Sequence, residues 1–450
     1  MKELKDLLLE MNKFFFDTRI PNWITQFLSF WVLLFAVSPY AHLPWGTGYR
    51  YLAYVAVPLA LIAIFYNINN LVFLKKWLYY FFQLINPFLP FLIGYLFIRL
   101  YYFKSLFDPE INFNVICLTV IFNAVVFSLL ACYRIKIKKQ YFFTACALSG
   151  CLFITDVLYT AYQHGVSIWE VRSFVRPYAT IYGKCVAIIG GLTIIGAFCS
   201  NSLSLKIKTS FILIGILCFV TSIGVLLVRA TLFVPFISLL CVMLLQRKID
   251  KRKLFLTIGI TAFLAVLTLT QTPLGSRLER GYQETVSTIL NKNLLTVIEK
   301  TRHEKKLTNA EEKIKKDLNT SMGGRVAVWT LATEGKINYW TGTGLGKPKY
   351  FIDVTKLFSY SKDYLSHFHS DYVQCYVVGG IILLASLVIT EILLFIRALY
   401  SPILLYLLFS MISFGLIDLG FLDLKAFCCF VGAWMIVSYW NLPFIQVIEK

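Results

Sequence analysis

The sequence predicts an all-α, polytopic membrane protein with about twelve transmembrane helices. Of its 450 residues, 58% are hydrophobic and 16% are aromatic. The mean hydropathy of +0.70 exceeds what a soluble domain needs to fill its core. Apolar runs of about 17 to 25 residues recur along the chain, which is the length that a helix needs to cross roughly 30 Å of hydrocarbon. One long polar stretch, residues 272–370, interrupts these runs.

The chain opens with a short amphipathic segment, residues 1–22, that we expect to lie on the membrane surface. Its charges of both signs and its lack of a small-residue cleavage site are not typical of a removable signal peptide. The apolar runs then predict spans at 23–40, 50–66, 77–99, 112–132, 141–160, 180–200, 210–227, 230–246, 254–271, 372–395, 402–418 and 424–441. The chain therefore divides into an N-terminal membrane region (1–271), a large polar loop (272–370) and a C-terminal membrane region (371–450).

The distribution of basic residues predicts the orientation of these spans. Lysine and arginine gather in alternate short connections, at residues 1–22, 75–76, 134–139, 206–208 and 247–253. Because cytoplasmic loops carry such an excess, we expect both termini in the cytoplasm and the loop 272–370 on the outer face, together with Arg172, Arg176 and Arg229. The net charge of +19 then reflects cytoplasmic loops and a site for an anionic lipid-linked substrate, and no nucleic-acid partner is expected.

Helical patterns dominate the polar loop. Apolar residues at helical spacing predict one helix over 278–290 and a second over 307–318, and a further helical run begins at Arg325 and ends at Gly335. Three glycines at 342, 344 and 346 then indicate an irregular turn. No strand is predicted, so the loop is expected to be a helical cover on the outer face.

Neither a metal site nor a cofactor is expected. None of the eleven cysteines lies in 272–370, and most fall in apolar spans, so they are expected to be small buried hydrophobic residues. The segment His367-Phe368-His369 resembles a fragment of a metal site, but no HExxH, DxD or carboxylate cluster accompanies it.

Two isolated arginines are candidates for binding an anion. Arg229 lies between two apolar spans with no acidic residue beside it. It either extends to lipid headgroups or, on the same face as the polar loop, binds an anionic substrate. Arg325 follows Gly323-Gly324 at the start of a predicted helix, where free N–H groups and a guanidinium suit a phosphate. The alternative for Arg325 is one more exposed cation in a basic loop.

His369 is the best candidate for a general base. It is one of only five histidines and lies where the polar loop re-enters the membrane. A neutral imidazole can accept a proton from a hydroxyl group at neutral pH. A purely structural histidine is the competing interpretation.

Three stretches resemble motifs of the O-antigen ligase family of lipopolysaccharide assembly, whose wider group includes O-antigen polymerases. Val228-Arg229-Ala230-Thr231-Leu232 is similar to a short arginine motif that opens a span. The run 321–329 followed by 341–346 is similar to the family's arginine, tryptophan and GxG stretch. His367 through Gly380 is similar to its histidine motif, and Gly415-Leu416-Ile417-Asp418 is a minor match to a late span.

The sequence departs from the family pattern at three positions. Ser370 replaces the asparagine that usually follows the histidine, Val378 replaces a common glutamate, and Trp340 stands where a proline often precedes GxG. Ser370 retains the ability to hydrogen-bond, and Asp371 is the alternative acid at the histidine motif.

The resemblance implies a GT-C-like glycosyltransferase in the bacterial inner membrane, with its active site facing the periplasm. It would transfer O-antigen from undecaprenyl pyrophosphate to a sugar hydroxyl of the lipid A–core, without a metal and with inversion. Arg229 and Arg325 would stabilise the pyrophosphate, and His369 would take the acceptor proton. Arg172, Arg176, Ser370 and Asp371 are further candidates for binding the substrate. The sixteen basic against ten acidic residues of the loop suit anionic lipid partners.

Three other functions remain open, and one of them, a protein-glycosylating transferase, usually carries an additional large C-terminal region. An O-antigen polymerase would use the same donor but a second donor-linked chain as acceptor, which residue chemistry alone hardly distinguishes. A flippase or transporter of lipid-linked oligosaccharides would predict interrupted helices in two related halves and charges lining a path. Neither feature is evident in the sequence.

Overall fold

The computed structural model describes residues 71–102, 113–132, 137–175, 179–199, 203–245, 294–318, 337–344, 369–422 and 424–442, and also residues 259, 325, 329–330 and 332. This part of the chain is helical, and its one β-type pairing is an isolated bridge between Asn338 and Gly342. The all-α prediction is therefore confirmed for these residues.

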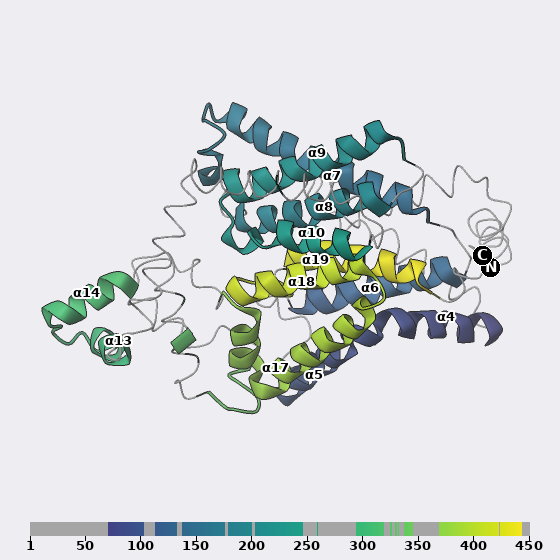
Figure 1. Cartoon of the computed structure of the whole chain (residues 1–450). Coiled ribbons are helices and arrows are strands. Elements are labelled where there is room, and N and C mark those ends of the chain that lie inside the picture. Colours follow the sequence, from purple (N-terminus) through teal and green to yellow (C-terminus); the bar gives the residue numbers. More distant parts are fainter. Residues whose placement is uncertain are drawn as a thin grey trace, which may run out of the picture.

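The helices form an elongated bundle of membrane helices and a separate pair in the polar loop (Figure 1). The bundle contains α4 (Leu71–Ile85), α5 (Leu89–Tyr101), α6 (Phe113–Cys132), α7 (Lys139–Gln163), α8 (Ala179–Cys199), α9 (Leu205–Phe219), α10 (Val234–Leu245), α17 (Asp371–Ala398), α18 (Pro402–Ile417) and α19 (Leu424–Trp440). The loop pair is α13 (Leu294–Arg302) and α14 (Asn309–Leu318).

Five helical segments in the described part are long and apolar enough to cross a membrane: Leu71–Tyr101, Lys139–Gln163, Ala179–Cys199, Leu205–Val225 and Asp371–Ala398. Three shorter apolar helices accompany them: Ile116–Cys132, Pro402–Leu416 and Ala426–Trp440. The spans expected at 23–40, 50–66 and, apart from residue 259, 254–271 lie outside the described residues. The number of twelve spans stays a prediction.

Helix α8 lies at the centre of the bundle and packs against α7, α9, α10, α18 and α19. Its small residues allow this close approach. A Cβ atom at Gly191 would lie 2.1 Å from the Tyr406 hydroxyl, and one at Gly190 would lie 2.7 Å from the Cβ atom of Cys218. The Tyr406 hydroxyl lies 3.0 Å from the carbonyl oxygens of Ala187 and Ile188. Side chains on α8 are therefore held by neighbours on every side.

The chain between α9 and α10 is irregular. A π-helical turn, Val220–Val225, follows α9, and Leu227 then has a positive φ of 53°. The 3-10 turn η4 (Arg229–Thr231) comes next and packs against α8 and α18. The irregular backbone is thus buried in protein, as membrane proteins require, and it carries one of the two arginines that the sequence singled out.

Helix α17 consists of two arms, because Gly380 breaks it with φ 61° and ψ −158°. The Tyr372 hydroxyl on the first arm lies 3.1 Å from both carboxylate oxygens of Glu391 on the second. In a straight helix these residues would be about 28 Å apart along the axis. The span expected at 372–395 coincides with the apolar helix Asp371–Ala398, but the break at Gly380 divides this helix and the two arms fold toward each other (Figure 1).

The segment 338–344 fills the break in α17. The Thr343 N–H and hydroxyl both donate to the Val377 carbonyl, at 2.8 and 3.0 Å. The Ile381 N–H donates to the Tyr339 carbonyl at 2.9 Å. These bonds satisfy backbone groups that the break releases. The glycine-rich turn that the sequence indicated is thus a docking segment for α17.

The loop pair α13 and α14 confirms one predicted helix and adds another. Helix α14 matches the helix expected over 307–318, and Thr308 and Glu311 form a reciprocal cap at its start. Lys300 of α13 pairs with Glu311 at 2.6 Å. Helix α13 was not predicted, and the helix expected over 278–290 lies outside the described residues.

Candidate active site

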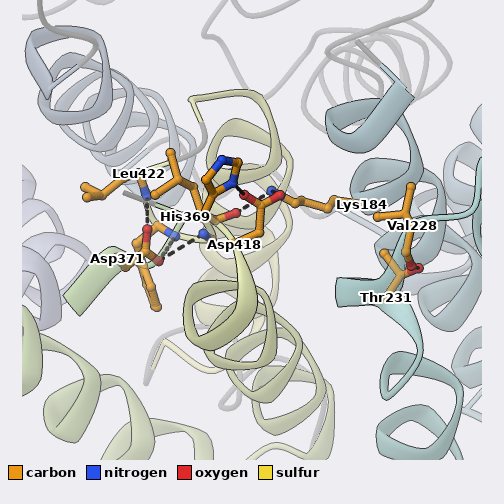
Figure 2. Close-up of polar contacts among 10 residues, drawn as sticks. Lys184, Val228, Thr231, His369, Asp371, Asp418 and Leu422 are labelled. Carbon is orange, nitrogen blue, oxygen red and sulfur yellow. Dashed lines mark hydrogen bonds and ion pairs between the residues drawn. The ribbon is translucent and has the colours of Figure 1, made fainter. Parts of the chain in front are cut away.

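His369 lies in a tight turn immediately before α17. Its φ of 52° is in the left-handed region, which histidine adopts more readily than most residues. Asp371 holds this turn in place, because its carboxylate accepts hydrogen bonds from the N–H groups of Gly420, Phe421 and Leu422 at 3.0, 2.7 and 3.1 Å (Figure 2). The start of α17 is thereby attached to the connection between α18 and α19.

This attachment brings His369 against Asp418. The distance from His369 Nδ1 to Asp418 Oδ1 is 3.1 Å, and both residues are buried. An ionised carboxylate can only accept a hydrogen bond, so Nδ1 carries the proton and the lone pair of the neutral ring is on Nε2. An acid that orients an imidazole in this way is the arrangement used by catalytic triads.

Lys184 of α8 binds the other oxygen of the same carboxylate. Its Nζ atom lies 3.1 Å from Asp418 Oδ2 and donates to the Leu419 carbonyl at 2.6 Å. Lys184 is only 1% exposed. Asp418 therefore lies between a lysine and a histidine, as Figure 2 shows.

Burial and these neighbours determine the charge of each group. Burial alone would raise the pKa of Asp418, but Lys184, the hydrogen bond from His369 and the Arg325 charge hold that pKa well below its usual value. Burial lowers the pKa of His369, and the positive charges of Arg325 and Lys184 lower this pKa further. Asp418 raises it, but the pKa of His369 stays below its usual value. At neutral pH the site therefore contains an ionised Asp418 and a neutral His369.

Arg325 lies close enough to this pair to act on both members. Its positive charge lowers the pKa of His369 and of Asp418, and its side chain is half-buried. The structure therefore brings together two of the three residues that the sequence singled out as catalytic, although they come from different parts of the polar loop.

Arg229 reaches the same region through its backbone, in the turn η4. The Ser222 hydroxyl lies 2.8 Å from the Thr231 hydroxyl and donates to the Gly183 carbonyl at 2.8 Å. Because Gly183 precedes Lys184 in α8, η4 and the His369–Asp418 pair are attached to adjacent residues. Figure 2 shows Lys184 directed toward Asp418, with Val228 and Thr231 on its other side. The side chain of Arg229 is not among those that the structure describes.

The four further candidates have different positions. Arg172 donates from Nη1 to the Leu227 carbonyl at 2.7 Å and so supports the turn before Arg229. Arg176 lies outside the described residues. Ser370 is buried at the N-cap of α17, and its carbonyl accepts from the Gln374 N–H. Asp371 directs its carboxylate to three backbone N–H groups, which indicates a positioning role.

Lys184 and Asp418 are site residues that the sequence reasoning did not select as catalytic or binding residues. Each carries a charge in or beside an otherwise apolar span. Ionisable residues in such places are rare and usually occur as pairs. Matching the two opposite charges across spans was the signal that could have identified them.

The arrangement provides the chemistry of proton removal beside an anion site. Nε2 of His369 can accept a proton, Asp418 can stabilise the imidazolium that forms, and Arg325 adds positive charge. Among the described residues, no group of three or more His, Cys, Asp or Glu side chains is placed to hold a metal ion.

Part of the chain, including most of the candidate site, is similar to a known family. Residues 210–388 match the family model described as O-antigen ligase, and a search of curated proteins finds no match. The matched segment contains Arg229, Arg325 and His369, whereas Lys184 and Asp418 lie outside it. The family carries out ligase or polymerase-type glycosyl transfer on O-antigen, and the apolar helices agree with a membrane protein. Residues 210–388 of the chain are therefore similar to the O-antigen ligase family.

Proposed function

We propose that this protein is an O-antigen ligase of the bacterial inner membrane. It transfers O-antigen polysaccharide from undecaprenyl pyrophosphate to a sugar hydroxyl of lipid A–core, on the periplasmic face. The transfer inverts the anomeric centre and needs no metal, and the fold that carries it is GT-C-like. The observation that best supports this function is the buried His369–Asp418 pair with the Arg325 charge beside it.

His369 acts as the general base. The acceptor hydroxyl gives its proton to Nε2 while its oxygen bonds to C1 of the first O-antigen sugar. Asp418, bound to Nδ1 at 3.1 Å, stabilises the imidazolium. General base catalysis of this kind contributes typically about 10²–10⁴-fold in rate. The neutral state of His369, which burial favours, keeps Nε2 ready to accept the proton.

The two arginines act on the leaving group. As the bond between C1 and the pyrophosphate oxygen breaks, the electron pair leaves with the pyrophosphate, and Arg325 and Arg229 stabilise the added negative charge. Arg172 supports this role by holding the backbone next to η4. Arg176 and Ser370 are proposed to bind the substrate less directly, and Asp371 to position the turn that carries His369.

Alanine variants in a reconstituted reaction test this function. We expect His369→Ala, Arg325→Ala and Arg229→Ala each to lower kcat by about 10²-fold or more, since each removes a group that acts in the transition state. The measurement is transfer to lipid A–core by the purified full-length protein in lipid nanodiscs, with a chelator present. Full activity of His369→Ala would show that the base assignment is wrong, and loss of wild-type activity on chelation would contradict metal independence.

The lipopolysaccharide of a deletion strain separates the ligase from its alternatives. Without the ligase, full-length polymer stays on the undecaprenyl carrier and none reaches lipid A–core. Without a polymerase, the core would carry a single repeat. Without a flippase, donor would accumulate on the cytoplasmic side. Either of the last two patterns would overturn the proposed function.

A further inference from the structure

Lys184 is a buried cation to which the transfer chemistry above gives no part. It lies in the otherwise apolar helix α8, is 1% exposed, and binds both the Asp418 carboxylate and the Leu419 carbonyl. Removing a charge from water is costly unless partners replace the lost hydration. A buried ion pair is weak evidence for stability alone, because an apolar pair of similar volume often packs as well.

The residue before Lys184 attaches α8 to the arginine turn. The Gly183 carbonyl accepts a hydrogen bond from Ser222 at 2.8 Å. A Cβ atom at Gly183 would lie 2.5 Å from Val228 Cγ2, so the backbones approach closely there. Two adjacent residues of α8 thus contact the segment before Arg229 and the carboxylate that binds His369.

We propose that Lys184 is a positioning residue of the transfer reaction. Through Asp418 it orients the His369 imidazole, and together with Gly183 it sets the distance between the base and the arginine turn η4. This inference rests on the proposed function of His369. It assigns a role to a residue outside the segment that matches the family.

The positive charge of Lys184 allows its role to be tested through the pH dependence of the reaction. The groups that act on the His369 ring are Asp418 from the α18–α19 connection, Lys184 from α8 and Arg325 from the polar loop, while Asp371 of α17 is directed to backbone N–H groups. Neutralising Lys184 removes one cation near His369 and also removes the lysine that shares the Asp418 carboxylate with the histidine. Both effects raise the pKa of His369. Because the base must be neutral, the acidic limb of the kcat–pH profile then moves to higher pH.

The test compares Lys184→Met, Lys184→Arg and Thr193→Val in the full-length protein reconstituted in lipid nanodiscs with donor and lipid A–core. Thr193 is the matched control, because it is equally buried in α8 and its hydroxyl donates within that helix. For Lys184→Met we expect kcat at neutral pH to fall by about 10-fold or more with KM changed less than about twofold, and the acidic limb to move to higher pH. Lys184→Arg should keep the limb at its wild-type position, and Thr193→Val should change neither quantity.

Other results would overturn the inference. A wild-type kcat–pH profile for Lys184→Met would contradict it. A lower kcat with the acidic limb at its wild-type pH would also contradict it, because that is the result expected for a lysine with only a structural role. If Lys184→Met does not fold, the double variant Lys184→Met/Asp418→Asn buries no lone charge and decides the question. Its kcat should equal that of Asp418→Asn within about twofold, since coupled residues are not additive, and a further tenfold loss contradicts the inference. If His369→Ala were fully active, the base assignment on which this inference rests would fail, whatever Lys184 does.

Discussion

His369 and Asp418 are buried groups whose protonation is linked to folding. The pKa of His369 is lower in the folded protein than its ordinary value of 6.5. Below pH 6.5 the unfolded chain therefore binds a proton that folded His369 resists, and stability falls as the pH falls through the folded pKa. The pKa of Asp418 is lowered from 3.8, so its contribution is present above 3.8 and is lost only in stronger acid.

These signs predict a loss of thermal stability between pH 7.5 and pH 5 that depends on His369. We expect the Tm of the detergent-solubilised protein to decrease over this range and His369→Gln to flatten the decrease, because glutamine does not titrate. His164→Gln is the control, since His164 is exposed and its ring stacks on Phe174. An equal flattening by both variants would contradict the linkage to the buried histidine.

Some residues of the candidate site could be selected from the sequence and others could not, for a physical reason. His369 and Arg325 could be selected as candidates because each lies in a stretch that resembles a family motif. Lys184 and Asp418 acquire their meaning only from each other, across a contact between α8 and the α18–α19 connection. Such a pair depends on tertiary structure, and the minor motif match at 415–418 did not indicate that Asp418 pairs with Lys184.

Among the helices, the break in α17 is the feature that most affects the site, because it directs the arm that follows His369. Gly380 has a positive φ, and a Cβ atom there would lie 2.3 Å from the carbonyl carbon of Trp340. Gly165 also has a positive φ, of 59°, but a Cβ atom there would meet nothing within 4 Å. Both glycines therefore have a backbone conformation that strains other residues, and Gly380 alone of the two would also bring a side chain against neighbouring backbone atoms.

We expect Gly165→Ala to cost about 1 kcal/mol, the cost of a left-handed residue with a side chain. Gly380→Ala should cost clearly more, because it also displaces the segment 338–344 from α17. The comparison is of Tm in detergent for the two variants, together with transfer activity. Equal destabilisation would show that the Trp340 contact adds nothing at this position.

Helix positions followed closely from hydropathy, whereas helix shape did not. The spans expected at 141–160, 180–200 and 402–418 coincide with α7, α8 and α18 to within a few residues, because a membrane helix needs a long apolar run. The break in α17 leaves such a run intact, so hydropathy does not detect it. It depends instead on a glycine conformation and on a docking segment from the polar loop.

Across the whole molecule, contacts place the site residues at one end of the helices. Arg172 after α7 binds Leu227 before η4, Ser222 binds Gly183 of α8, and Asp418 after α18 binds His369 before α17. At the other end, Lys139 at the start of α7 lies over the ring of Trp440 at the end of α19. Among the described residues, one end therefore holds His369, Asp418 and the backbone of Arg229, which is the arrangement that a substrate held in one leaflet requires.

The charge bias of the loops predicts that this end faces the periplasm. Lys206 and Lys208, at the start of α9, belong to a basic connection expected in the cytoplasm, whereas the connection between α13 and α14 belongs to the outer loop. Alkaline phosphatase folds only in the periplasm, so we expect a fusion inserted after Lys305 to be active and one after Ser204 to be inactive. A fluorescent protein at the C-terminus should fluoresce, since that end is expected in the cytoplasm. The reverse pattern of enzyme activity would place His369 in the cytoplasmic leaflet, where lipid A–core carrying mature O-antigen could not be assembled by the proposed reaction.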